Sequence, residues 1–158
     1  MKVSALEEFG LRCLLQIGRK GDNGSLTISE LSQLEGVSAP NIAKVMRLLR
    51  RAGFVKSTRG QAGGYSLSRP RDQIIVGEVL AVLGGRIFEP NFCEKHAGFE
   101  LLCNHSVDCS IRSVWRTVQG AIDEILGKLT LQDLLCSEHE LKPWAVPSAA
   151  LPTVSRPQ

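Results

Sequence analysis

Residues 37–71 constrain the fold of this chain most strongly, because all the charges in this segment have one sign. The segment holds eight Lys or Arg residues and no Asp or Glu, in a chain of 158 residues with a formal net charge of only +3. A long run of one charge in an otherwise mixed sequence indicates a surface that meets a polyanion. We therefore expect nucleic acid to bind here.

The first part of this segment has the pattern of one amphipathic helix. Ser38 stands at the N-cap position, Pro40 is tolerated in a first turn, and Gly53 ends the pattern. Apolar residues recur between them at three- and four-residue steps, as a buried helix face requires; they are Ile42, Val45, Met46 and Leu49. The other face offers groups that reach base edges and phosphates. These candidate DNA contacts are Ser38, Pro40, Asn41, Lys44, Arg47, Arg50 and Arg51.

A hairpin is predicted directly after this helix. Residues 54–58 and 65–68 have the composition of two short strands, and residues 59–64 form a glycine-rich tip between them. A helix followed by such a hairpin is typical of the recognition helix and wing of a winged helix-turn-helix. Arg59 and Gly60 are the candidate DNA contacts of the wing, with Arg59 entering a narrowed minor groove. The alternative is a solvated basic helix beside an ordinary hairpin.

Two capping boxes predict the helices that precede the recognition helix. Ser4 with Glu7 opens a first helix that ends at Gly18, and Thr27 with Glu30 opens a short second helix. Two helices, a turn containing Gly, and a basic third helix give the order of a helix-turn-helix. The predicted fold class is therefore mainly α with a small β-hairpin.

Charge separates the chain into parts. Residues 1–75 carry 12 basic and 6 acidic side chains, whereas residues 76–158 carry 7 and 10. We expect a winged helix-turn-helix DNA-binding domain at 1–75, and a loop with a dimerisation helix at 76–136. Residues 137–158 hold four of the seven prolines and few large apolar groups, and we expect a disordered tail there.

A continuous apolar stripe predicts a long helix after Ser110. It runs over about five turns and needs a partner surface; its members are Ile111, Val114, Trp115, Val118, Ile122, Ile125, Leu126 and Leu129. We expect a two-fold homodimer through this helix. Such a dimer matches the paired half-sites of an inverted-repeat operator.

The sequence also indicates a compartment. No window approaches eighteen consecutive apolar residues and the N-terminus lacks a signal-peptide core, so we expect a cytoplasmic protein with no membrane partner. Five cysteines are an odd number, and in a reducing compartment they are expected to be thiols or metal ligands.

Three of these cysteines lie close together in the sequence. Cys93, Cys103 and Cys109 follow the pattern C-x9-C-x5-C, within or next to a segment, residues 86–108, that shows no sustained periodicity. In a compact domain, a loop of this length usually has a functional role. Thiolates suit iron-sulfur clusters, zinc or copper, so three of them can surround one metal centre. The alternative is three unrelated surface thiols.

Several motifs together resemble one family of bacterial regulators, the family that includes IscR, NsrR, RirA and RsrR. They are MKVS at residues 1–4, the wing RGQAGGY at 59–65, the three cysteines, CSIRSVW at 109–115 and LTLQDLL at 129–135. The resemblance implies a dimeric winged-helix regulator. It also implies an iron-sulfur cluster, 2Fe-2S or 4Fe-4S, that senses iron, nitric oxide or redox state.

The resemblance implies a fourth ligand besides the three cysteines. In the IscR branch this ligand is a His three residues after the last Cys, but here that position is Arg112, whose guanidinium has no lone pair to donate. In the NsrR and RsrR branches a carboxylate near the N-terminus of the other subunit is the fourth ligand, and Glu8 aligns with it by resemblance. The expected metal site is Cys93, Cys103, Cys109 and Glu8, with His96 and His105 as alternatives to Glu8.

The function predicted from these patterns and from the resemblance is a DNA-binding transcriptional regulator that acts as a repressor. An iron-sulfur cluster that senses redox state, nitric oxide or iron status is expected to control its operator binding. One alternative is a cluster-free regulator of the same fold, switched by thiol oxidation, a metabolite or a partner protein. A second alternative is a redox enzyme or electron carrier. The chain has no dinucleotide fingerprint, C-x-x-C pair or nucleophile-base motif to favour an enzyme.

Overall fold

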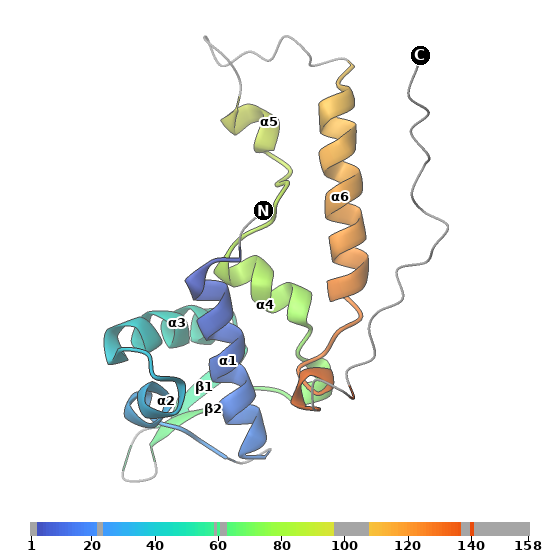
Figure 1. The fold of residues 1–158 in the computed structure, drawn as a ribbon. Helices are drawn as coiled ribbons and strands as arrows, with labels where there is room; N and C mark the ends of the chain where they lie inside the picture. The colour runs from blue at the N-terminus through green and yellow to red at the C-terminus, as the bar shows by residue number, and fades with distance from the viewer. Residues whose placement is uncertain are drawn as a thin grey trace.

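The computed structural model describes residues 3–21, 24–58, 60, 63–96, 108–136 and 140. The part of the chain it describes is mainly helical, with one two-stranded sheet (Figure 1). This architecture confirms the predicted fold class. No helix within these residues is long and apolar enough to cross a membrane.

The first helix, α1 (Ala5–Arg19), begins at the predicted capping box. The hydroxyl of Ser4 accepts the Glu7 backbone N–H at 3.3 Å, and the Glu7 carboxylate accepts the Ser4 N–H at 2.8 Å. Both bonds satisfy donors that a helix start leaves without partners. The apolar face of α1 then enters the core, where Cys13, Leu14 and Ile17 are fully buried.

The helix-turn-helix follows as α2 (Ile28–Glu35) and α3 (Ala39–Arg51). Gly36 ends α2 with φ +64°, a left-handed conformation that favours glycine. Ser38 occupies the N-cap of α3 as predicted, but its hydroxyl makes no capping hydrogen bond. Its backbone carbonyl accepts the Asn41 N–H at 3.0 Å instead, and Pro40 has no N–H to cap.

The core lies where α3 packs against α1 and α2. All four residues of the predicted apolar face of α3 are fully buried: Ile42, Val45, Met46 and Leu49. Fully burying a side chain of this kind stabilises the fold by about 1.5–3 kcal/mol relative to exposure. The buried face therefore holds α3 in place and turns its charged face to solvent.

The wing is an antiparallel hairpin of β1 (Val55–Thr58) and β2 (Gly64–Leu67), with Val55 opposite Leu67. A short bridge adds Leu26, whose N–H and carbonyl bond Tyr65 at 3.0 and 2.8 Å. The strands lie within one residue of the predicted ranges. Arg59 at the tip lies outside the described residues.

Beyond the wing, η1 (Arg71–Gln73) leads into α4 (Val76–Leu83), which packs against α1 and α3. The chain returns to this place after the last long helix. The N–H of Val76 bonds the carbonyl of Leu129, and the N–H of Leu131 bonds the carbonyl of Ile74, both at 2.8 Å. The final turn η3 (Asp133–Leu135) follows at once.

Residues 86–96 contain α5 (Phe92–Lys95), which the sequence analysis did not predict. A helix of four residues is too short to show a period, but its aromatic residues pack locally. The rings of Phe88 and Phe92 lie 5.0 Å apart, and the His96 ring stacks on Phe92 at 4.0 Å.

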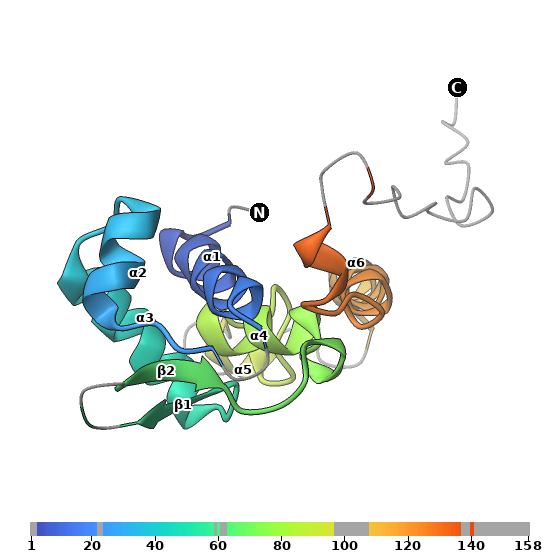
Figure 2. The same ribbon diagram turned by 90° about the horizontal axis from the view of Figure 1, so that it is seen from below.

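The long helix α6 (Ser110–Leu126) confirms the helix predicted from the apolar stripe. It stands beside the body of the molecule, joined to it at its C-terminal end near α4 (Figures 1 and 2). Gln119 is the one buried residue of this helix. Four large apolar side chains of the stripe are therefore exposed: Ile111 at 65%, Val114 at 57%, Trp115 at 40% and Val118 at 37%.

Candidate nucleic-acid interface and metal centre

The solvent face of α3 is the candidate nucleic-acid interface. All seven predicted contacts on or next to this helix are exposed, and the helix contains no acidic residue. They are Ser38, Pro40, Asn41, Lys44, Arg47, Arg50 and Arg51. The first four lie at the N-terminal end of α3, where helix-turn-helix proteins place their base contacts.

Arg50 connects this helix to the wing. Its Nη1 donates to the Ser57 hydroxyl at 3.3 Å, so its guanidinium bridges α3 and β1 on the exposed surface. Of the two predicted contacts on the wing, Gly60 is exposed with φ +114°, and Arg59 lies outside the described residues. Arg50 thus links the charged face of α3 to the first strand of the hairpin.

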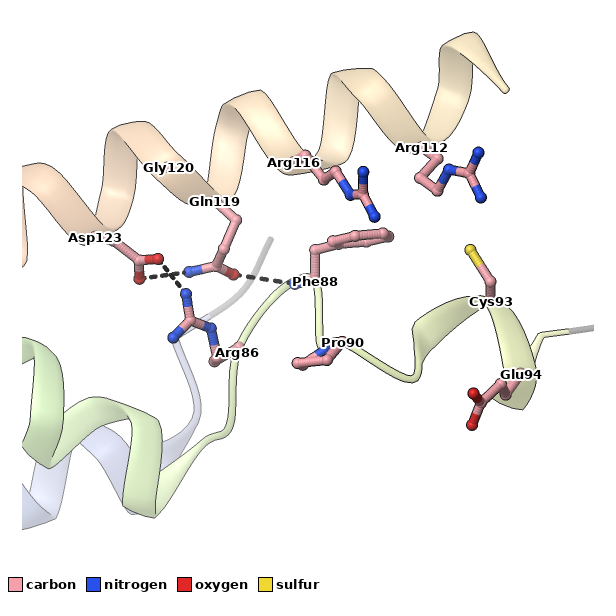
Figure 3. A pocket seen from close by; sticks show the side chains of 10 residues that line it. All are labelled: Arg86, Phe88, Pro90, Cys93, Glu94, Arg112, Arg116, Gln119, Gly120 and Asp123. Carbon is pink, nitrogen blue, oxygen red and sulfur yellow. Dashed lines mark hydrogen bonds and ion pairs between the residues drawn. The ribbon is translucent and has the colours of Figure 1, made fainter. Parts of the chain in front are cut away.

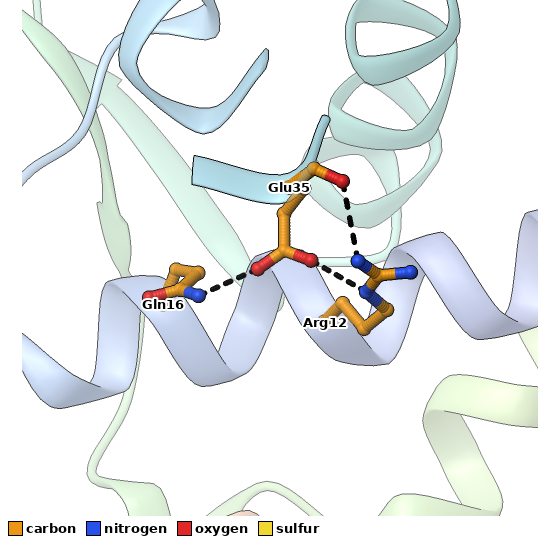
Figure 4. A network of polar contacts seen from close by, with 3 residues as sticks. All are labelled: Arg12, Gln16 and Glu35. Carbon is orange, nitrogen blue, oxygen red and sulfur yellow. Dashed lines mark hydrogen bonds and ion pairs between the residues drawn. The ribbon is translucent and has the colours of Figure 1, made fainter. Parts of the chain in front are cut away.

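A partly buried polar network, which the sequence analysis missed, fixes the helix-turn-helix against α1 (Figure 4). The carboxylate of Glu35, the last residue of α2, accepts from Arg12 Nε at 2.5 Å and from Gln16 Nε2 at 2.6 Å. Arg12 Nη2 also donates to the Glu35 carbonyl at 3.2 Å. Arg12 and Gln16 lie four residues apart on α1, whereas Glu35 belongs to α2, so no local pattern marks the contact between them.

Two of the three predicted cysteine ligands lie near the N-terminal end of α6. Cys93 lies on α5, and Cys109 is the N-cap of α6, where its Sγ accepts the Arg112 backbone N–H at 3.3 Å. Both thiols are free and partly buried. Cys103 and His105 lie outside the described residues. Within the described part of the chain no three His, Cys, Asp or Glu side chains form a metal-binding group.

An open cavity of about 540 Å³ lies between α6 and the segment that carries Cys93 (Figure 3). The guanidinium groups of Arg112 and Arg116 extend from α6 toward this segment, and the Cys93 thiol points toward Arg112. Glu94 also lines the cavity, and its carboxylate points away from α6. The cationic side chains of α6 therefore share this space with the thiol.

Hydrogen bonds and an ion pair join the walls of the cavity around Gln119. Gln119 accepts the Phe88 backbone N–H at 3.0 Å and donates to Asp123 at 2.9 Å. Asp123 also forms an ion pair with Arg86. These bonds attach the segment before α5 to the middle of α6 and explain why Gln119 is buried.

The candidates for a fourth ligand lie elsewhere. Glu8 is exposed in the first turn of α1 and does not line the cavity of its own chain. His96 is also exposed, and its Nδ1 contacts the Phe92 carbonyl at 2.8 Å in addition to the ring stacking. The contacts of His96 are therefore those of a residue that packs on its own short helix.

The remaining cysteines differ in their surroundings. Cys13 is fully buried, and this burial raises the pKa of its thiol to about 12. The nearby Glu35 carboxylate contributes to this increase in the pKa, and the Arg12 guanidinium opposes it. Cys136 is exposed after η3, and its thiol donates to the Asp133 carbonyl at 2.7 Å. Cys13 therefore packs in the core as a small apolar side chain.

The chain is similar to known regulators over most of its length. A family model described as Rrf2, iron-dependent transcriptional regulator, matches residues 3–137. Protein rrf2 of Nitratidesulfovibrio vulgaris is 31% identical over 135 residues, which is 85% of this chain and 87% of that protein.

Two solved structures are similar as well. CymR, the global cysteine regulator of B. subtilis, has 29% identity and a TM-score of 0.67, covering 85% of this chain and 96% of that one. IscR of T. potens has 29% identity and a TM-score of 0.66, covering 85% and 86%.

Proposed function

Because the chain belongs to the Rrf2 family of transcriptional regulators, we propose that it binds an inverted-repeat operator under the control of an iron-sulfur cluster. Proteins of this fold bind DNA and are typically dimeric, and the relatives are named as regulators and not as enzymes. The proposal assigns DNA binding to residues 1–75 and the response to residues 76–136. It places the protein in the cytoplasm with the chromosome.

The observation that best supports the proposal is the position of the free thiols. Cys93 and Cys109 are partly buried at the end of α6 that lies far from η3, and Cys109 already accepts a hydrogen bond from the backbone of Arg112. Soft thiolates with such bonds suit iron-sulfur clusters. The donors that are described therefore fit the group, and Cys103 is proposed as the third thiolate.

Glu8 is proposed as the fourth ligand, supplied by α1 of the partner subunit. Its carboxylate is exposed on the first turn of α1, whereas the neighbouring Glu7 caps Ser4. An exposed carboxylate on a rigid helix is available to a second chain. A carboxylate is a harder ligand than a thiolate and binds such iron more weakly. A bound cluster would supply sensitivity to oxidants, nitric oxide or iron supply.

The proposed dimer forms through α6. Its exposed apolar stripe includes Trp115, with Val114 and Val118 on the same side. Aliphatic and aromatic residues that cluster on one helix and remain exposed are typical of an interface. Pairing two α6 helices sets the spacing of the two α3 helices, and therefore which operator half-sites the dimer reads.

The test is operator binding by two forms of one preparation. Anaerobic isolation should yield coloured protein that contains iron and sulfide, and a gel-shift titration should give different affinities for the holo and apo forms. Colourless protein under those conditions, or equal affinities of the two forms, would refute cluster control. The Glu8→Ala variant should retain the three thiolates yet show an altered spectrum and a less stable cluster.

A second candidate function is a cluster-free regulator of the same fold. It is favoured by the similarity to CymR, which is described as a global cysteine regulator. In that case the protein would respond through thiol oxidation, a metabolite or a partner protein. The same anaerobic preparation separates the two candidates, because the cluster-free regulator is colourless and still binds the operator.

A further inference from the structure

Arg112 and Arg116 occupy a distinctive position on α6. They are four residues apart, so both extend from the same side of the helix, and both line the cavity that Cys93 also lines (Figure 3). Arg112 is partly buried and Arg116 is exposed. Two acidic residues also line the cavity: Asp123, which is bonded to Arg86 and Gln119, and Glu94, whose carboxylate points away from α6 (Figure 3).

Three features bring positive potential to the cysteines at this end of α6. Cys109 is the N-cap of a helix of 17 residues, whose dipole is positive at this end. The Arg112 backbone N–H donates to Cys109 Sγ at 3.3 Å. The guanidinium of the same residue extends toward the Cys93 thiol. One residue therefore acts on both cysteines, through different atoms.

We propose that Arg112 and Arg116 are charge-compensating residues that raise the reduction potential of the cluster held by these cysteines. The inference rests on the proposed function and deepens it, since it names residues that set the sensing range. The proposed ligands, three thiolates and a carboxylate, would each bring negative charge to a bound cluster. One-electron reduction adds one more negative charge and breaks no bond, so nearby cations stabilise the reduced form more than the oxidised form.

The experiment is a redox titration of anaerobically isolated holo protein, followed by absorbance, with dithionite as the one-electron reductant. Arg112→Gln and Arg116→Gln should both titrate at lower midpoint potentials than the wild type. The shift should be larger for Arg112, which is less exposed and whose guanidinium extends toward the Cys93 thiol. Arg112→Lys keeps the charge and should restore most of the potential. Because Arg116 is exposed, its variant decides the question even if Arg112→Gln assembles no cluster.

Arg19→Gln is the matched control. Arg19 is in the last turn of α1, at the opposite end of the molecule from the start of α6, and its loss changes the net charge equally. Its midpoint potential should equal that of the wild type. Wild-type potentials for both Arg112→Gln and Arg116→Gln would overturn the inference while leaving the proposed function intact. A wild-type protein without iron would instead overturn the proposed function.

Discussion

The Nε–H of Arg12 donates to Oε2 of Glu35 at 2.5 Å and joins the middle of α1 to the last residue of α2. The side chain of Glu35 is only 6% exposed, whereas that of Arg12 is 40% exposed. Glu35 directly precedes Gly36, where the chain turns toward α3. The pair therefore fixes the turn from which the recognition helix starts.

Arg12→Ala should destabilise the protein by about 1–3 kcal/mol, because among the described residues it leaves the nearly buried Glu35 carboxylate with Gln16 as its side-chain donor. Urea unfolding followed by circular dichroism measures this change in the free energy of unfolding. Arg47→Ala is the matched control, since Arg47 is exposed in the middle of α3 and should change stability by less than about 0.5 kcal/mol. Equal midpoints for the two variants would show that Glu35 does not need Arg12.

Lys44→Ala should weaken operator binding and also reduce its salt dependence. Lys44 is exposed on the first turns of α3, and losing one phosphate contact lowers the slope of log K against log salt by about 0.9. Fluorescence anisotropy at several salt concentrations measures both quantities. Lys128→Ala serves as the control, because Lys128 follows α6 and pairs with Glu124. An unchanged slope would remove Lys44 from the phosphate contacts.

Asn41→Ala should reduce sequence discrimination and leave the salt slope unchanged. An exposed amide at the start of α3 can bond a base edge but carries no charge, and losing one such contact costs about 1–3 kcal/mol of discrimination. The measurement compares affinities for the operator and for unrelated DNA. If both affinities fall equally, Asn41 contacts the DNA backbone instead.

Trp115→Glu should convert the proposed α6 dimer to a monomer. Trp115 lies in the centre of the exposed stripe on α6, and a carboxylate buried there without a partner is strongly unfavourable. Sedimentation velocity measures the oligomeric state, and circular dichroism checks that the helices remain. Thr117→Glu is the control on a different side of α6. A dimeric Trp115→Glu protein would place the interface elsewhere.

Cys13 should resist alkylation in the folded protein, whereas Cys136 should react. Burial raises the pKa of the Cys13 thiol to about 12, so at pH 7–9 it stays protonated, and the thiolate is the nucleophile. Mass spectrometry after iodoacetamide treatment of the apo protein measures the modification of each cysteine. In urea, Cys13 should react like the others. Rapid modification of folded protein at Cys13 would contradict the buried position.

Much of the fold could be predicted from local patterns. The capping boxes at Ser4 and Thr27, the apolar steps of α3 and the glycine-rich tip each act within a few residues, so they are legible in the sequence. The short helix α5 was missed because four residues cannot show a period. The exposed basic face of α3 was predicted as well, because burying Ile42 and Val45 leaves one orientation for the charged side.

The sequence by itself determined which segments become helices and which helix face is charged, since both depend on spacing along the chain. The tertiary structure alone decided that Arg12 meets Glu35 and that Arg112 lies beside Cys93. These contacts join helices whose relative positions depend on packing of the whole core, and no local spacing encodes that packing.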